Sequence, residues 1–432
     1  MRRTPRRPDR PCADVPRRPP DSPPDSPAPT VLTPFPPAWP RRGIRRRHGR
    51  RTAVTHPVHE AEGLLGKTKN LKENPLFNDQ KFKLGVFSAN CSGGLVMSDA
   101  PTNFRVTWDQ QLRIARTADR LGLEAMVPVG RWIGFGGDTN FNGVCFETYT
   151  WAAGLAQATE NIGIFTTTHL PTVHPVAGAK MAATVDHISG GRFGMNLVMG
   201  WFTPEMELFG GRQLEHDERY AYGQEWLDFA EKLWNEPDSF DFQGTFFQAK
   251  GASSYPKPVL DPRPALINAG ASPAGQEFSA RNVDVNLIAL PVEEVPGYVK
   301  RIKGLAHTKY ERDIDVWTYC LVICRETEKE AKAAYRAIID AGDWPGARNI
   351  MEVLGVQSQS FGSQIDKFQE RFIAGWGGPT LMGTPEQVTE QFAELSEAGM
   401  SGAVFGFLDY ADELAQFGAE VLPLMRKHGL RH

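Results

Sequence analysis

Residues 182–205 read AATVDHISGGRFGMNLVMGWFTPE and contain the end of one helix, a turn and one strand. The helix is expected to start at Pro175, because proline suits the first helical position, and to stop at Ser189, where Gly190 and Gly191 follow. The next run, FGMNLVM at residues 193–199, is almost wholly apolar, as a strand buried on both faces requires. A helix that leads directly into such a strand is a repeating unit of parallel α/β folds.

The same unit recurs along the chain. Eight short β-rich runs, each ending near Gly, Asn, Ser or Thr, alternate with segments of helical periodicity. They cover residues 84–88, 124–129, 162–167, 193–199, 265–269, 285–290, 316–323 and 403–407. Both faces of such apolar strands must be covered, and a closed parallel barrel covers them. The sequence therefore predicts the α/β class and a (β/α)8 TIM barrel.

An open, doubly wound sheet is the main alternative fold. It is disfavoured because no GxGxxG motif follows a strand: no helix follows residues 134–137 (GFGG), and residues 270–275 lack the Lys-Ser/Thr pair of a P-loop. Insertions are expected at residues 130–145, 200–217, 236–262 and 341–383. The insertions that follow strands would lie at the C-terminal mouth of the barrel, where active sites of this fold are built.

Local signals also predict details of single helices. Gly122 stands where a left-handed C-cap is expected after the first helix, and Asp217 is a plausible N-cap for the helix after the fourth strand. Asp186 and Arg192 flank the glycine turn, and we expect them to pair with each other and to serve structure. The last helix carries one apolar face formed by Leu414, Phe417, Val421, Leu424 and His428.

Residues 1–60 differ in composition from the rest of the chain. The first 52 residues hold 14 Arg and 14 Pro against 4 Asp and no Glu, although the whole chain has a net charge of −3. We expect residues 1–60 to be a disordered Arg/Pro-rich extension and residues 83–432 to be one barrel domain. One interpretation is that the extension is an arm that binds nucleic acid or a membrane surface. The other is that it is a dispensable segment, and we favour this one. The negative charge of the remaining residues disfavours nucleic acid as their partner.

The lack of a targeting signal and the scattered cysteines indicate a reducing compartment. There is no run of 18 apolar residues for a transmembrane helix, and the Arg-rich start lacks the apolar stretch of a secretory signal. The 5 cysteines are scattered and form no CxxC pair. We therefore expect a cytoplasmic protein without a disulfide framework.

Several motifs together resemble one family. They are SGGL (92–95), GFGG (134–137), the 186–196 stretch, GWFTPE (200–205), HDERY (216–220), AGAS (269–272) and GTPEQ (383–387). With them the chain resembles the luciferase-like flavin-dependent monooxygenases, in the branch of pyrimidine, dimethylsulfone and alkanesulfonate monooxygenases. The resemblance covers nearly everything from Lys83 to the C-terminus.

Two residues are expected at the reacting centre. Asn196 is an amide inside an apolar strand, so it either satisfies loop backbone or faces a ligand with donor and acceptor edges. Thr167 ends the third strand, where threonine is also simply a good strand residue. The resemblance implies that Asn196 contacts flavin and that Thr167 lies near flavin N5 and oxygen.

The resemblance implies further flavin contacts in the loops. Gly130 and Arg131 would meet the pyrimidine end of the flavin, where the pyrimidine enzyme has Lys in place of Arg. Glu205 matches another contact position, and its alternative reading is a loop carboxylate near a helix start. His216 lies in the shared HDERY motif and is a candidate proton donor or substrate contact.

A phosphate site is expected where a cation meets a helix start. The resemblance assigns phosphate and ribityl contacts to Arg219, Tyr220 and Ser272, and the step from Ser272 to proline opens a helix with free N–H groups. Ser272 could equally be only the N-cap of that helix. No metal site is expected, because His169 and His174 have no carboxylate at ligand spacing.

The resemblance implies an enzyme that binds reduced FMN non-covalently and uses O2 as co-substrate to oxygenate a small organic molecule, with cleavage of a carbon–heteroatom bond. A separate NAD(P)H:flavin reductase would supply the flavin, and a homodimer or homotetramer is expected. The substrate stays open among sulfones, sulfonates, heterocyclic amides and halogenated compounds. Two alternatives remain: a deazaflavin (F420)-dependent oxidoreductase on the same barrel, and a nucleic-acid-binding protein that uses the basic arm.

Overall fold

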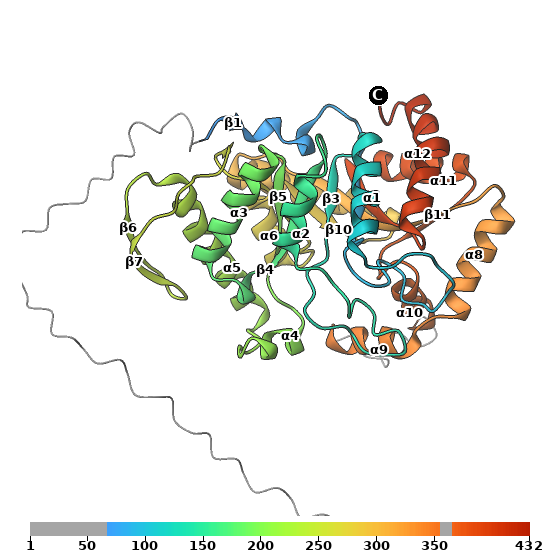
Figure 1. The fold of residues 1–432 in the computed structure, drawn as a ribbon, viewed down its shortest axis with the longest axis horizontal. Helices are drawn as coiled ribbons and strands as arrows, with labels where there is room; N and C mark the ends of the chain where they lie inside the picture. The colour runs from blue at the N-terminus through green and yellow to red at the C-terminus, as the bar shows by residue number, and fades with distance from the viewer. Residues whose placement is uncertain (1–66, 355–364) are drawn as a thin grey trace, which may run out of the picture. The chain divides into compact units, whose positions relative to one another are not determined.

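The computed structural model describes residues 67–354 and 365–432. Eight parallel strands close into a barrel, since β10 pairs with β11 and β13 pairs with β2 (Figure 1). In order around the barrel they are β2 (Lys83–Phe87), β3 (Ala125–Val127), β4 (Gly163–His169), β5 (Phe193–Val198), β9 (Ala265–Asn268), β10 (Val285–Ile288), β11 (Asp315–Cys324) and β13 (Gly402–Gly406). The predicted (β/α)8 TIM barrel is confirmed, and each predicted strand overlaps its observed counterpart.

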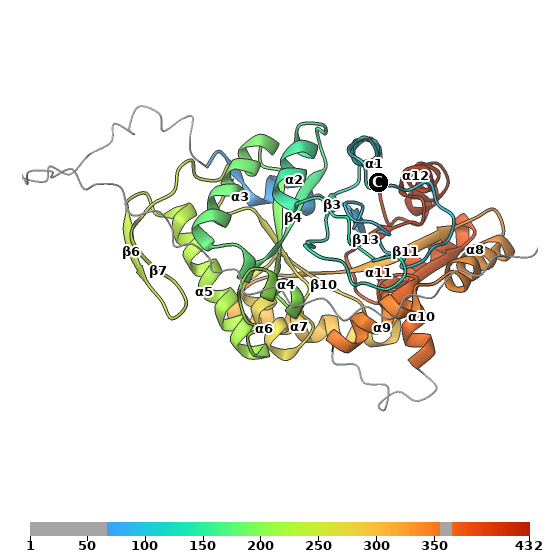
Figure 2. The same ribbon diagram turned by 60° about the horizontal axis from the view of Figure 1, so that its bottom comes forward.

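Helices follow the strands and cover the outside of the barrel (Figures 1 and 2). Seven strands are each followed by one principal helix: α1 (Trp108–Arg120), α2 (Thr148–Ala156), α3 (Pro175–Ser189), α5 (His216–Asn235), α6 (Pro273–Asn282), α7 (Val295–Tyr310) and α12 (Tyr410–Lys427). After β11 the chain instead forms α8 (Glu328–Asp340), α9 (Trp344–Val353), α10 (Ile365–Ile373) and α11 (Pro385–Glu397) before it enters β13.

Several shorter strands and helices lie outside the eight-stranded barrel. The sequence did not indicate β12 (Thr380–Gly383), which extends the sheet beside β11, because this strand is only partly buried and is not a continuous apolar run. The hairpin of β6 (Phe240–Gln243) and β7 (Gln248–Ala252) packs on α5 through the rings of Phe229 and Phe242 (Figure 2). The remaining short elements are β1 (Lys69–Asn70), which pairs with β8 (Leu260–Asp261), α4 (Thr203–Leu208), η1 (Leu71–Glu73), η2 (Pro75–Phe77), η3 (Leu170–Thr172) and η4 (Val292–Glu294).

Strand alternation decides which side chains face the barrel axis. In β4, Ile164 belongs to the apolar layer between strands and helices, whereas Phe165 belongs to the cluster inside the barrel. Thr167 lies two residues after Phe165 and therefore faces inward. Asn196 stands opposite Thr167 in the β4–β5 register, between the outward-facing Met195 and Leu197. The two polar residues thus meet inside the barrel at its C-terminal end.

The helix boundaries follow most of the local signals. α3 begins at Pro175 and ends on Gly190, which has φ +64°, and Gly122 has φ +71° after α1. The N-cap prediction for Asp217 is wrong: α5 begins at His216 with Glu215 as its cap, so Asp217 lies inside the first turn. The acidic residues of this turn still face the positive end of the helix dipole.

The predicted pair of Asp186 and Arg192 does not form. Asp186 instead accepts a hydrogen bond from the backbone N–H of Leu260 at 3.0 Å. Arg192 donates to the carbonyls of Ala156 and Thr159 and so satisfies groups at the C-terminal end of α2. Both residues remain structural, as expected, with different partners.

The expectation of no disulfide is also wrong, because Cys91 and Cys145 are bonded. They face each other in an isolated antiparallel bridge between two loops that are 54 residues apart in sequence, a pairing that no local spacing reveals. Within the described parts of the chain, no helix is long and apolar enough to cross a membrane.

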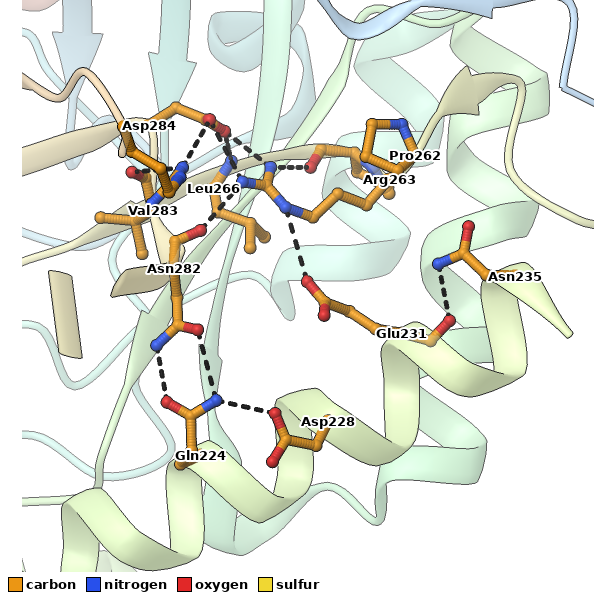
Figure 3. A network of polar contacts seen from close by, with 12 residues as sticks. Gln224, Asp228, Glu231, Asn235, Pro262, Arg263, Leu266, Asn282, Val283 and Asp284 are labelled. Atoms are coloured by element: carbon orange, nitrogen blue, oxygen red, sulfur yellow. Dashed lines mark hydrogen bonds and ion pairs between the residues drawn. The ribbon is translucent and has the colours of Figure 1, made fainter. Parts of the chain in front are cut away.

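A polar network at the N-terminal ends of β9 and β10 ties α5 to the barrel (Figure 3). Arg263 lies between two carboxylates: it donates to Asp284 at 2.8 Å and approaches Glu231 of α5 at 3.6 Å. Asp284 also accepts from the N–H of Leu266 at 2.8 Å. This end of the barrel carries stability, and the opposite end carries the candidate site.

Candidate active site

Thr167 and Asn196 form a buried pair on the floor of the barrel mouth. The Asn196 Nδ2 donates to Thr167 Oγ1 at 3.1 Å, and the Thr167 hydroxyl donates to the carbonyl of Pro128. The Asn196 Oδ1 is buried and has no partner among the described residues. A buried amide oxygen without a partner is unusual, so this atom is an acceptor available to a ligand.

Beside this pair lies an ionic cluster formed by Arg131, His169 and Glu205. The Arg131 Nη1 lies 3.3 Å from Glu205 Oε1, and the His169 Nδ1 lies 3.0 Å from Glu205 Oε2. The backbone N–H of Trp132 donates to Glu205 Oε1 at 2.7 Å. All three charged or ionisable side chains are buried, with Glu205 at 0% exposure.

Burial sets the protonation states of this cluster. It lowers the pKa of Arg131 to about 10, although the Glu205 charge works in the opposite direction. Burial also lowers the pKa of His169, so its imidazole is neutral at physiological pH. For Glu205, burial raises the pKa, but the contacts with His169 and Arg131 outweigh it and the net shift is downward. The cluster is therefore one cation, one anion and one neutral imidazole.

Aromatic rings enclose the Arg131 guanidinium. Its carbon lies 4.5 Å from the ring centre of Phe135 and 5.3 Å from those of Trp201 and Phe202. These rings come from the GFGG and GWFTPE motifs, so both motifs serve to hold the cation by cation–π contacts. In the part of the chain that the structure describes, its Nε is buried without a hydrogen-bond partner, whereas its Nη1 is held by the ion pair with Glu205.

Gly130 matters because it has no side chain. A Cβ at this position would lie 2.8 Å from the Thr167 carbonyl oxygen. The glycine thus lets the loop after β3 pass close over the end of β4, which brings Arg131 beside Thr167.

The expected phosphate residues gather at the start of α6. Ser272 is the N-cap, since its Oγ accepts from the N–H of Gly275 at 3.2 Å, and this structural reading is confirmed. A Cβ at Gly270 would lie 2.6 Å from the Tyr220 hydroxyl, so this hydroxyl stands directly over the turn. Arg219 donates from Nη1 to the carbonyl of Gly200 at 2.8 Å, while its Nε is buried without a partner among the described residues.

A buried polar network, which sequence reasoning missed, supports this turn from below. The Asn268 Oδ1 accepts from the N–H of Gly270 at 2.8 Å and from Ser279 Oγ at 3.0 Å. Asn286 donates to the same serine at 3.0 Å and accepts from the Tyr298 hydroxyl at 2.7 Å. Because each member is hydrogen-bonded, the network fixes the conformation of the AGAS turn.

His216 lies apart from the reacting centre. Its side chain is 48% exposed, and its Nδ1 pairs with Asp217 Oδ1 at 2.8 Å. It contacts the ring of Tyr220 and neither Thr167 nor Asn196. The geometry thus brings together the other predicted site residues in two groups and leaves His216 at the rim near the second.

His169 is the site residue that sequence reasoning missed. Its position two residues after the inward-facing Thr167 is a signal that could have found it. The expectation of no metal site stays a prediction: the described residues include no group of three or more His, Cys, Asp or Glu side chains that could hold an ion.

The fold and the site define a (β/α)8 barrel protein with a polar site at its C-terminal mouth, in which some buried side-chain atoms have no hydrogen-bond partner among the described residues. The chain belongs to the luciferase-like monooxygenase family, whose model matches residues 82–402. It is 30% identical to the FMNH2-dependent dimethylsulfone monooxygenase of Pseudomonas putida over 81% of this chain and 96% of that protein. It is 32% identical to pyrimidine monooxygenase RutA of Pseudomonas savastanoi pv. phaseolicola over 80% of this chain and 97% of that protein.

Solved structures confirm the fold. A riboflavin lyase, solved with modified FMN and its substrate riboflavin, superposes with a TM-score of 0.73 at 21% identity, over 82% of this chain and 93% of that one. At 21% identity this likeness shows the fold alone.

Proposed function

We propose that this chain is a monooxygenase that binds reduced FMN at the C-terminal mouth of its barrel and uses O2 to oxygenate a small organic substrate. The observation that carries the proposal is the concentration of buried, unpartnered polar atoms at the mouth. They are Arg131 Nε, Asn196 Oδ1, Gln213 Oε1 and Arg219 Nε. Buried polar groups are normally hydrogen-bonded, so unpartnered ones that gather at one place support a polar ligand there.

The residues fit the two ends of a flavin. Arg219 and Tyr220 lie with the Ser272 cap at the start of α6, where free N–H groups and a cation suit a phosphate. Arg131 and Asn196 offer a donor and an acceptor at the other end, beside the apolar interior of the barrel. This combination of an anion site with a mixed donor and acceptor site supports FMN over an uncharged ligand.

Each residue then has a defined task. When bound, reduced flavin supplies the electrons that activate O2. Arg131 holds the ring by charge, and Glu205 fixes Arg131 and the backbone N–H of Trp132. Thr167 and Asn196 orient the small molecules on the floor of the mouth. The aromatic rings around Arg131 help to exclude water from the reacting centre.

A separate reductase is expected as a partner, because reduced FMN must reach the mouth from outside. The described residues show no dinucleotide-binding module of the Rossmann type in addition to the barrel. The matched relative from Pseudomonas putida is named as FMNH2-dependent, which supports the same arrangement here. The homodimer or homotetramer remains a prediction that sedimentation analysis can test.

The decisive screen measures oxygen uptake with reduced FMN in the presence of sulfones, sulfonates, uracil-like heterocycles and halogenated aromatics. We expect one of these classes to give oxygenated product in step with oxygen uptake. The sulfone and heterocycle classes come first, because the relatives are divided between them. Tight binding of reduced deazaflavin without oxygen uptake would instead establish the oxidoreductase alternative.

A further inference from the structure

His169 is the last residue of β4 and lies beside the ionic cluster of the mouth. Its ring is 3% exposed. It lines a cavity of about 120 Å³ together with Gly130, Arg131 and Thr167, and a Cβ at Gly130 would lie 3.5 Å from its Cδ2. The edge of the ring that includes Cδ2 therefore lies against the loop that carries Arg131.

The contact with Glu205 determines which ring nitrogen carries the proton. The Nδ1 lies 3.0 Å from a carboxylate oxygen, a distance at which two acceptors would repel each other. The Nδ1 therefore bears the hydrogen, and in the neutral ring the Nε2 is then an acceptor. No residue of the described ranges 67–354 and 365–432 donates to this nitrogen, which leaves it available for a ligand.

A residue with a donor and a residue with an acceptor thus line the same small cavity. The Arg131 Nε–H has no hydrogen-bond partner among the described residues, and the His169 Nε2 carries a lone pair. An imide edge, in which an N–H lies between two carbonyl groups, is the complement of such a pair. The pyrimidine ring of a flavin has an edge of this kind.

We propose that His169 is a specificity-determining residue of the mouth, whose Nε2 accepts a hydrogen bond from the imide N–H of the bound flavin while Arg131 meets an adjacent carbonyl. The inference rests on the proposed function, because it concerns the same ligand. It assigns to His169 a direct contact with the cofactor, and to Glu205 the positioning of both neighbours.

The test compares FMN with 3-methyl-FMN, in which a methyl group replaces the imide hydrogen. Dissociation constants are measured anaerobically for both reduced flavins, so the readout is binding and not turnover. Wild-type protein is expected to bind the methylated flavin at least roughly tenfold more weakly, because one hydrogen bond is lost and the acceptor is left buried.

Two variants separate the ring nitrogens. In His169→Asn the amide N–H replaces Nδ1 toward Glu205 but nothing replaces Nε2, so FMN binding should weaken roughly three- to tenfold and the preference over 3-methyl-FMN should vanish. In His169→Gln the amide oxygen can replace the acceptor, so part of the preference should return. His174→Asn is the matched control, since this exposed histidine caps α3 away from the cluster, and it should behave as wild type.

The outcomes are distinct. Equal binding of FMN and 3-methyl-FMN by wild-type protein would overturn the inference, whatever the variants do. The same conclusion follows if His169→Asn keeps the full preference. If wild-type protein binds no flavin at all, the proposed function fails together with the inference, whereas normal FMN binding without discrimination removes the inference alone.

Discussion

The hydroxyl of Thr167 serves two partners at once, and this arrangement limits what it can do for a ligand. Its hydrogen is used by the Pro128 carbonyl, and its oxygen accepts from Asn196. The hydroxyl therefore orients the Asn196 amide, whose Oδ1 is left as the atom that faces a ligand. A donor toward oxygen becomes available only when a ligand draws the hydroxyl hydrogen away from Pro128.

The substitution Thr167→Val keeps the shape of the side chain and deletes the hydroxyl. We expect it to bind reduced FMN normally, but to lose about 100- to 1000-fold in product formation or to release hydrogen peroxide in its place. Product and peroxide are quantified in the same reaction. Asn196→Ala should show the same loss of product formation together with weaker FMN binding, because its Oδ1 is the acceptor that faces the ligand. Wild-type turnover and coupling in both variants would reduce the pair to ordinary strand residues.

Arg219 tests the phosphate end of the site. Arg219→Ala should weaken FMN binding by about 1.5–3 kcal/mol, because a charge-assisted contact is lost. Riboflavin lacks the phosphate and should bind wild type and variant alike, as fluorescence titration can show. Arg212→Ala, at an exposed arginine of the loop that precedes α5, is the control. Equal losses for FMN and riboflavin would place Arg219 away from the phosphate.

At the scale of elements, Asp186 joins α3 to β8 through its hydrogen bond to Leu260. Burial raises the pKa of this carboxyl to about 6, despite the opposing effects of the Leu260 hydrogen bond and the nearby His187 and Lys69 charges. The folded chain therefore holds a proton that the unfolded chain has already released at the same pH. This raised pKa makes folding less favourable as pH rises from about 4 to about 6.

Asp186→Asn should remove that pH dependence. Relative to the variant, the wild-type free energy of unfolding should fall by about 2 kcal/mol between pH 4 and pH 7. Denaturant titrations at several pH values measure this difference, with exposed Asp79→Asn as the control. Parallel stability curves for wild type and Asp186→Asn would contradict the raised pKa.

Sequence reasoning predicted the elements well because their signals are local. Apolar runs gave all eight barrel strands, and the glycines after α1 and α3 adopt the expected left-handed conformation. The start of α5 was missed by two residues, because Glu215, His216 and Asp217 are all polar and several could cap the helix. Local preferences decide whether a helix exists more firmly than where it begins.

The site was less accessible to such reasoning because its contacts join distant segments. The family motifs pointed to Arg131, Asn196 and Glu205, but no local pattern reveals that His169 meets Glu205 or that Asp186 turns away from Arg192. The same limit explains the missed disulfide between Cys91 and Cys145. Parallel strands bring their C-terminal ends together whatever their separation in sequence, so only the closed barrel shows which side chains meet.

At the scale of the whole molecule, a truncation tests whether residues 1–60 contribute to flavin binding and turnover. Residues 1–60 lie outside the described residues, and their Arg/Pro composition lacks an apolar pattern for docking on a barrel. Removing them should leave flavin affinity and turnover nearly unchanged. Loss of folding or activity would make the extension part of the enzyme, and salt-sensitive polynucleotide binding that disappears with it would support the nucleic-acid alternative.

The central claim is that one oxygen atom of O2 reaches the product with reduced FMN as the electron source. The most direct measurement supplies heavy-isotope-labelled dioxygen to the enzyme, reduced FMN and the best substrate of the screen, and analyses the product by mass spectrometry. The account predicts one labelled oxygen atom per molecule of product, and oxygen uptake that depends on FMN. An unlabelled product, or turnover that proceeds with reduced deazaflavin in the absence of oxygen, would contradict it.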